Sequence, residues 1–153
     1  MSLETDFLAV YTKFKMYFYR EIFSNREEAA ENLTTVEAFC MEVIHAMKRP
    51  TINEFASYIR ISQPNAAYKV NNLQRKGFLR KIHSTKDKRE YFLEVTQKYT
   101  DSVSESASFM KEVIDKTEAR LSPEEKEVAG KVLRIMAEEM DFGVPTFVPK
   151  NED

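Results

Sequence analysis

The feature that most constrains the fold lies in residues 51–96, where two short helical patterns precede a basic hairpin. The first pattern covers 51–60, and the second covers 63–76 after a break. Two runs with strand composition follow, 78–83 and 90–96, and a charged turn joins them. This order predicts a helix-turn-helix followed by a two-stranded wing.

Long amphipathic helical patterns flank this unit. In residues 5–24, apolar side chains recur at the spacing of one helix face, at Phe7, Tyr11, Phe14 and Phe18. After the wing, one long helix is expected from Thr96 to Leu121, and another to about Phe142. Capping boxes are expected at the starts of three helices: Thr34 with Glu37, Thr51 with Glu54, and Ser122 with Glu125.

The length and composition indicate one mainly helical (α+β) domain. The chain has 153 residues, of which 42% are hydrophobic and only 3 are glycine. We expect a winged-helix core over 34–97, dimerisation helices over 4–24 and 98–142, and a loose tail over 143–153. The wide apolar faces of the terminal helices favour a dimer lobe; the alternative is that they pack as the core of a monomer.

The sequence also predicts the compartment. It has no apolar run long enough to span a membrane and no pattern of a signal peptide. Its one cysteine cannot form an internal disulfide. We therefore expect a cytoplasmic protein without a membrane partner.

Charge is distributed unevenly along the chain. The net charge is −2, but residues 69–89 hold eight basic residues and one acid, a local balance of +7. Residues 101–153 hold thirteen acids and seven bases, a balance of −6. Binding of nucleic acid needs a basic face and not a basic protein. The alternative is that the basic run is ordinary solvated surface.

The second helix of the pair separates a core face from a face that could contact DNA. Ala66, Val70 and Leu73 share the core face, whereas the opposite face carries no acid. Asparagine pairs bidentately with adenine, and tyrosine can bond a phosphate or pack on a thymine methyl. The free amides at the helix start suit a phosphate. The predicted DNA contacts on this helix are Ser62, Gln63, Asn65, Tyr68, Lys69 and Asn72.

The tip of the hairpin is the second predicted DNA contact. An arginine can enter a narrow minor groove, where the potential is most negative, and an aspartate can hold that arginine through a bidentate pair. The alternative is a surface hairpin whose Asp–Arg pair only stiffens the turn. The predicted contacts here are Lys86, Asp87, Lys88 and Arg89.

These motifs resemble the MarR (multiple-antibiotic-resistance regulator) family. The matching residues are Leu33-Thr34, Ser62, Leu73-x-x-Lys76-Gly77-Phe78-Leu79, and Asp87-x-Arg89 followed by Leu93-x-Val95-Thr96. The resemblance covers nearly the whole chain in helix order. It implies an obligate dimer with interlocking terminal helices. It also implies that Arg89 enters the minor groove while Asp87 positions it.

The chain departs from the family in its recognition helix and after the wing. Family members often carry Thr at the positions of Asn65 and Ala67, and Arg at those of Tyr68 and Asn72. Tyr99 stands where glycine is frequent. The operator sequence therefore cannot be transferred from relatives. The resemblance also suggests a crevice for a small aromatic or phenolic effector, lined by Tyr11, Phe14, Tyr17, Phe18, Phe39 and His45; the alternative is that these residues are plain core.

Other chemistries find little support in the sequence. Cys40 lies on an apolar helix face, where cysteine is usually inert, and His45 is too far around the helix to activate it. Two histidines and one cysteine, widely separated, make no metal site. No phosphate loop or nucleophile motif indicates an enzyme, and no cofactor is expected.

The sequence thus predicts a regulator that binds an operator in double-stranded DNA. We expect a homodimeric repressor that recognises a pseudo-palindromic operator and is released by a small ligand. The rival interpretation is a winged-helix module that binds proteins and not DNA. The acidic C-terminal part and the missing recognition arginines are the observations that favour the rival.

Overall fold

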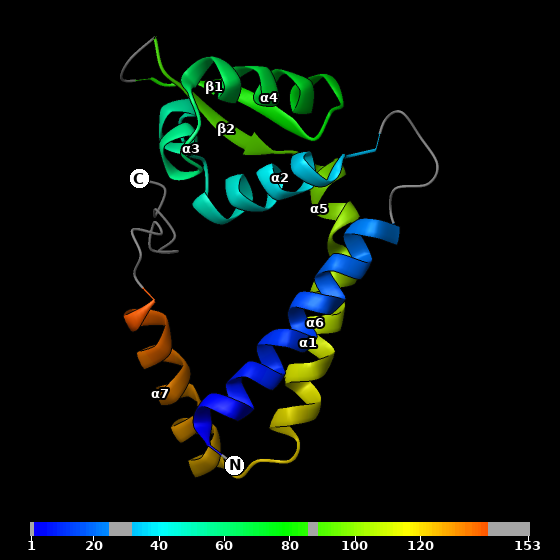
Figure 1. The fold of residues 1–153 in the computed structure, drawn as a ribbon, viewed down its shortest axis with the longest axis vertical. Coiled ribbons are helices and arrows are strands. Elements are labelled where there is room, and N and C mark those ends of the chain that lie inside the picture. Colours follow the sequence, from blue (N-terminus) through cyan, green and yellow to red (C-terminus); the bar gives the residue numbers. More distant parts are fainter. Residues whose placement is uncertain (1, 25–31, 86–88, 141–153) are drawn as a thin grey trace. The chain divides into compact units, whose positions relative to one another are not determined.

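The structure of the chain is a computed structural model that describes residues 2–24, 32–85 and 89–140. The two strands pair antiparallel, with Leu79 opposite Val95 and His83 opposite Tyr91. The predicted mainly helical fold with a small two-stranded wing is confirmed (Figure 1). The elements are α1 (Leu3–Ser24), α2 (Thr35–Met47), α3 (Ile52–Tyr58), α4 (Gln63–Arg75), β1 (Leu79–His83), β2 (Tyr91–Val95), α5 (Gln97–Ser102), α6 (Ser104–Glu118) and α7 (Pro123–Glu139).

All three predicted capping boxes form. In each box the threonine or serine oxygen accepts the amide three residues on, and the glutamate accepts the amide of the cap residue. The boxes fix the starts of α2, α3 and α7 at Thr34, Thr51 and Ser122. The start of α4 differs, because Ser62 caps the amide of Asn65 at 3.4 Å and the third position holds no acid.

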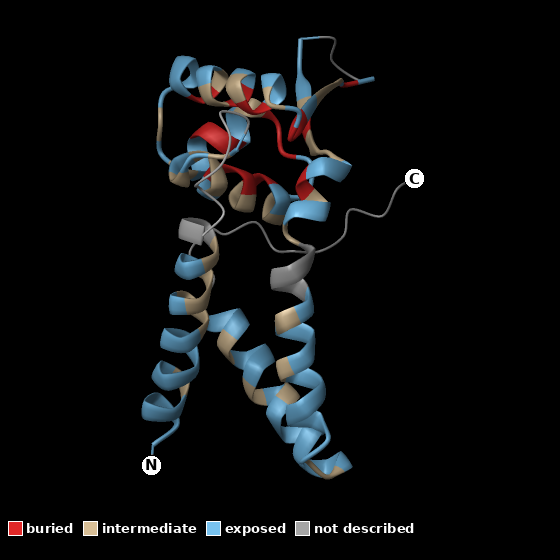
Figure 2. Ribbon diagram, turned by 90° about the vertical axis from the view of Figure 1, so that its right-hand side faces the viewer, coloured by how far each residue is buried: buried red, intermediate tan, exposed pale blue. Residues whose placement is uncertain are grey.

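The buried core belongs to the winged-helix part of the chain. Ala66, Val70 and Leu73 of α4 are fully buried, as the sequence predicted. They share this core with Met41 of α2, Phe55 of α3, Phe78 before β1 and Leu93 of β2, among others. Figure 2 shows the buried positions gathered in α2–α4, the wing and the start of α5.

The connection between α2 and α3 pairs with the edge of β2 that does not face β1. The amide of Leu93 donates to the carbonyl of Pro50 at 2.8 Å, and Thr51 forms an isolated bridge with Phe92. Pro50 and Thr51 are both buried. Sequence reasoning missed this pairing, because it interpreted these residues only as the end of one helix and the cap of the next.

The chain divides into two compact units, residues 1–99 and 100–153. In the first unit, α1 contacts α2 through a stacked ring pair, Phe18 with Phe39, whose centroids lie 6.3 Å apart. In the second unit, neither α6 nor α7 has a buried residue among those whose burial is described. No helix in the described ranges is both long and apolar enough to cross a membrane.

The single long helix predicted from Thr96 to Leu121 is wrong. The structure interrupts it at Val103, whose dihedral angles (φ −103°, ψ 0°) leave the helical region, and no side-chain hydrogen bond caps the start of α6. The segment around the break, Asp101-Ser-Val-Ser-Glu-Ser, alternates serines with other residues, and serine favours competing local bonds over the helix. The predicted tail, 143–153, lies outside the described residues.

Candidate functional site

The exposed face of α4 carries the side chains that the sequence predicted. Ser62, Gln63, Asn65 and Tyr68 are exposed, the last with 67% of its surface accessible. Lys69 and Asn72 are half-buried at the edge of this face. The first turn holds no acid, so the partial positive charge of the helix start is not offset. This surface is polar, aromatic and free of carboxylates, which suits a polyanion.

Asn72 is less available than the sequence suggested. Its Oδ1 atom accepts a hydrogen bond from Nη2 of Arg75 at 3.2 Å, one turn further along α4. The neighbouring guanidinium therefore biases the orientation of the Asn72 amide group. Arg75 is exposed and was counted in the basic run but not among the predicted contacts, although its position in that run was a usable signal.

A hydrogen bond ties α4 to the wing. Nζ of Lys81 on β1 donates to Oδ1 of Asn71 at 2.6 Å. The two parts of the predicted site, the helix and the hairpin, thus form one surface with a defined spacing. Sequence reasoning missed Lys81 as a positioning side chain, because the two residues belong to different elements.

The hairpin is described only at its base. Lys86, Asp87 and Lys88 lie outside the described residues, so the predicted Asp87–Arg89 pair lies there too. Arg89 is exposed. At the end of the strands, the rings of His83 and Tyr91 pack across the ladder with centroids 4.2 Å apart.

The opposite end of the strand pair holds a charge cluster. Glu94 of β2 pairs with Arg80 of β1 and lies 3.7 Å from Nε of Arg49. The guanidinium of Arg49 also lies 6.0 Å from the ring centroid of Phe92. Part of the positive charge near the wing is therefore compensated within the protein.

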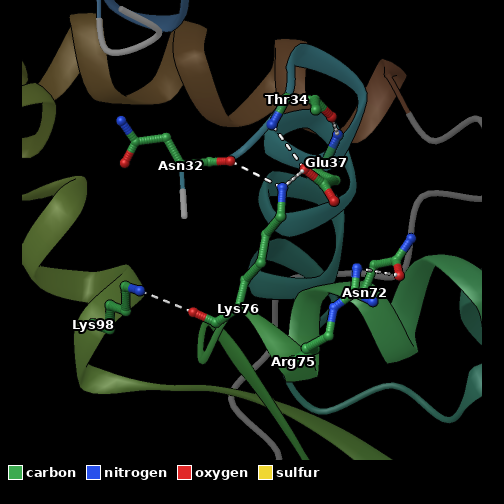
Figure 3. A network of polar contacts seen from close by, with 7 residues as sticks. All are labelled: Asn32, Thr34, Glu37, Asn72, Arg75, Lys76 and Lys98. Atoms are coloured by element: carbon green, nitrogen blue, oxygen red, sulfur yellow. Dashed lines mark hydrogen bonds and ion pairs between the residues drawn. The ribbon is translucent and has the colours of Figure 1, made fainter. Parts of the chain in front are cut away.

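The last turn of α4 is held by a polar network (Figure 3). Nζ of Lys76 donates to Oε2 of Glu37 at 2.7 Å and to the carbonyl of Asn32 at 2.9 Å. The Lys98 ammonium donates to the carbonyl of Lys76 at 2.9 Å and lies 4.5 Å from the ring centroid of Phe78. Only 16% of the Lys76 side chain and 12% of the Glu37 side chain are exposed.

Glu37 serves two partners at once. The same carboxylate oxygen accepts the amide of Thr34 at 2.8 Å and the ammonium of Lys76. Burial raises the pKa of the Glu37 carboxyl, but the hydrogen bonds from Lys76 and Thr34 outweigh burial and hold that pKa below its ordinary value. The carboxylate is therefore ionised wherever the protein is folded near neutral pH.

The predicted effector residues make different ring contacts in the structure. Phe18 and Phe39 stack between α1 and α2, while Phe14 and Tyr17 of α1 are half-buried. Tyr11 is exposed and stacks on Phe7 of its own helix at 6.2 Å. His45 lies near the other end of α2, where its ring forms a T-shaped pair with that of Tyr99, with centroids 5.6 Å apart. The Phe18–Phe39 pair is the part of this group that joins two elements.

Cys40 is buried, with 5% of its surface exposed. Burial raises the pKa of its thiol, which outweighs the opposite effect of Lys69. A thiol of this kind is a poor nucleophile at neutral pH. Over the described ranges, no three potential metal-ligating side chains lie close enough together to hold an ion.

Residues 33–91 match the sequence model described as the MarR family. No curated protein matches the chain. Among solved structures, Streptococcus pneumoniae FabT in complex with DNA is similar at 21% identity and a TM-score of 0.59, over 90% of this chain and 96% of that chain.

Two further solved structures share the fold. A mutant of MepR from a multidrug-resistant S. aureus clinical isolate has 18% identity and a TM-score of 0.63, over 91% of this chain and 97% of that one. A MarR family protein from Bacillus stearothermophilus has 14% identity and a TM-score of 0.63, over 90% of this chain and 92% of the other. At these identities the likeness shows the fold.

Proposed function

We propose that this protein is a sequence-specific DNA-binding transcriptional regulator. Residues 33–91 match the sequence model of the MarR family, and the chain shares the fold of solved structures from that family. Members of the family are transcription regulators and not enzymes. We further propose that the protein acts as a homodimer, binds a pseudo-palindromic operator, and represses transcription.

The observation that carries the proposal is the exposed face of α4. A capped helix start without acids, followed by Asn65 and Tyr68 pointing away from the core, offers amides and hydrogen-bonding side chains to a duplex. The Lys81–Asn71 bond attaches this face to a hairpin on which Arg89 is exposed. A helix for the major groove and a cationic hairpin beside it are the two parts that a winged-helix reader needs.

The homodimer is supported by the apolar side chains of the terminal helices. In the single chain, Leu8 and Val10 of α1 and Val128 and Leu133 of α7 are each at least half exposed. A helical unit without any described buried residue has no core of its own. We infer that a second copy covers these faces, because isolated helices of this length are marginal in water.

Repression and release by a ligand complete the proposal. Two recognition helices about 34 Å apart would occupy successive major grooves and block access to the DNA between them. The stacked Phe18–Phe39 pair, which joins α1 to α2, is the place where we expect a small aromatic or phenolic effector to insert.

The test is a selection of duplexes from a random pool, followed by titration of the best duplex at several salt concentrations. We expect an imperfect palindrome, and an affinity that falls steeply as salt rises because several phosphates are neutralised. Binding that does not depend on salt, or a preference for single strands, would contradict the proposal.

One set of contacts favours the rival function, a protein-interaction module. Glu37 and Glu94 neutralise Lys76 and Arg80, so the basic run is less cationic than its sequence suggests. If the folded dimer selects no duplex from the pool, the rival interpretation should replace the regulator.

A further inference from the structure

The ion pair between Lys76 and Glu37 differs from the other described ion pairs of this chain. It joins residues 39 positions apart, and both side chains are largely buried, whereas the Lys111–Asp115 and Lys116–Glu112 pairs lie on the exposed face of one helix. Exposed pairs of that kind contribute little to stability. The Lys76–Glu37 pair, in contrast, joins two elements: the end of α4 and the start of α2.

Lys76 is the C-cap residue of α4, directly after Arg75. Its ammonium donates to Glu37 and to the carbonyl of Asn32, and its own carbonyl accepts from Lys98. Figure 3 shows these contacts reaching the helix end from two sides. Gly77 follows with a φ of +81°, so the chain turns sharply away at this point. The orientation of the last turn of α4 is therefore set by side chains from α2 and α5.

We propose that Lys76 and Glu37 are positioning residues for DNA recognition, which fix the C-terminal end of the recognition helix without touching DNA. This inference rests on the proposed function. Asn72, which the sequence predicted as a base contact, lies one turn before Lys76 on α4 and shares that turn with Arg75. A tilt of the helix end would move this asparagine, and a small displacement suffices to lose a bidentate pair with a base.

Because Glu37 is negatively charged, its replacement should change DNA affinity in opposite directions under the two explanations, electrostatic and positional. Glu37→Gln removes a negative charge near a DNA-binding surface, so electrostatics alone would strengthen binding to a polyanion. The positioning role predicts the opposite, because glutamine keeps the capping box but cannot pair with an ammonium by charge. The direction of the change in affinity therefore separates the two explanations.

Glu54 provides a matched control. It occupies the same position in the capping box of α3, accepting the amide of Thr51 at 2.7 Å, but no lysine pairs with it among the described residues. Glu54→Gln removes the same charge from the same unit of the protein and keeps the same cap. We expect it to bind DNA as well as the parent or slightly better.

The first arm of the experiment titrates the selected duplex with the parent, Glu37→Gln, Lys76→Met, the double variant and Glu54→Gln. Glu37→Gln should weaken binding about fivefold, as expected for the loss of one hydrogen-bonded ion pair. The double variant should bind as weakly as Lys76→Met alone, since both changes break the same contact. Binding by Glu37→Gln that equals or exceeds that of Glu54→Gln overturns the inference.

The second arm needs no DNA. Amide hydrogen exchange at Lys76 and Gly77, which donate to Asn72 and Gln74 within the helix end, should become faster in Glu37→Gln and Lys76→Met but not in Glu54→Gln. Unchanged exchange in both pair variants overturns the inference, whatever the DNA titration gives. If the parent binds no duplex, the proposed function has failed, and this second arm still decides whether the pair holds the helix.

Discussion

The hydroxyl of Tyr99 donates a hydrogen bond to Oε1 of Glu42 at 2.8 Å, joining the start of α5 to the middle of α2. Tyr99 is 2% exposed, and its ring forms a T-shaped pair with the ring of His45. Tyr99 is also the residue at which the sequence departs from the frequent glycine of the family that it resembles. The Tyr99 ring fills a position in the core, and its hydroxyl group is hydrogen-bonded to Glu42.

Tyr99→Phe should lower the free energy of unfolding by about 1 kcal/mol at neutral pH, because the variant loses one hydrogen bond and keeps the ring. Urea unfolding followed by circular dichroism measures this difference. Tyr58→Phe is the control, since Tyr58 is exposed and its hydroxyl has no place in the core. Equal losses in the two variants would show that the contact with Glu42 contributes nothing specific.

The Tyr99–Glu42 contact should also affect how the free energy of unfolding changes at alkaline pH. Burial, followed by the charge and hydrogen bond of Glu42, raises the pKa of Tyr99 well above its ordinary value. The folded state therefore resists ionisation, so this contribution to stability is present below about pH 10 and is lost as the pH rises further. Between pH 9 and about 11, the parent should lose more stability than Tyr99→Phe. Parallel pH profiles for the two proteins would contradict this assignment.

Acid pH should act through Glu37. The pKa of this carboxyl is lowered in the folded state, so the folded protein binds the proton more weakly than the unfolded chain does. The corresponding stability is present above the ordinary glutamate value, about 4.3, and is lost as pH falls through the lower folded value. Glu37→Gln should therefore show a shallower loss of stability between about pH 5 and 3 than the parent. Chemical denaturation across this range measures the difference.

The local part of the fold could be predicted from the sequence, and the tertiary part could not. Capping boxes at Thr34, Thr51 and Ser122 depend on residues three apart, and all three form. The core face of α4 follows from helical periodicity, and Ala66 and Val70 are fully buried. Such signals lie within one turn or one helix, where the sequence determines geometry directly.

The features that sequence reasoning missed depend on residues far apart in the chain. Glu37 was assigned to a capping box, and nothing in its neighbourhood indicates a partner 39 positions away. The pairing of Thr51 with Phe92 likewise joins two elements whose approach is set by the core. The break at Val103 was missed because apolar residues on either side keep a helical spacing through it. The contacts with DNA stay predictions.

Asn65→Ala and Arg89→Ala should weaken DNA binding in different ways. Asn65 projects from the exposed face of α4, so its loss should cost ~1–3 kcal/mol on the best operator and relax base preference at one position per half-site. Arg89→Ala should weaken binding to many sequences and reduce the salt dependence, with little change in base preference. Titrations of the operator and of single-base variants at two salt concentrations separate the two patterns.

Cys40 should be unreactive in the folded protein. Its burial and raised pKa keep the thiol neutral and inaccessible at pH 7. A maleimide should label the native protein much more slowly than the protein in denaturant, as mass spectrometry can follow. Fast labelling of the native state would contradict this prediction and would indicate that α2 opens locally and exposes the thiol.

The protein should scatter light as a dimer at micromolar concentration, with about twice the monomer mass of 17.9 kDa. Leu133→Asp places a charge on an apolar position of α7 that is 62% exposed in the single chain, and it should shift the mass toward the monomer. A parent protein that scatters as a monomer at this concentration would remove the basis for a two-fold operator.

The pairing of Pro50 and Thr51 with β2 affects the tendency of the protein to aggregate. A two-stranded hairpin would normally present two edges at which strands of other molecules could add. Here the backbone of β2 is already engaged on its far side by the Pro50 carbonyl and the Thr51 bridge. The remaining edge belongs to β1, which carries Arg80 and Lys81, and like charges repel an incoming copy of the same strand. The wing can therefore be exposed while remaining a poor template for fibrils.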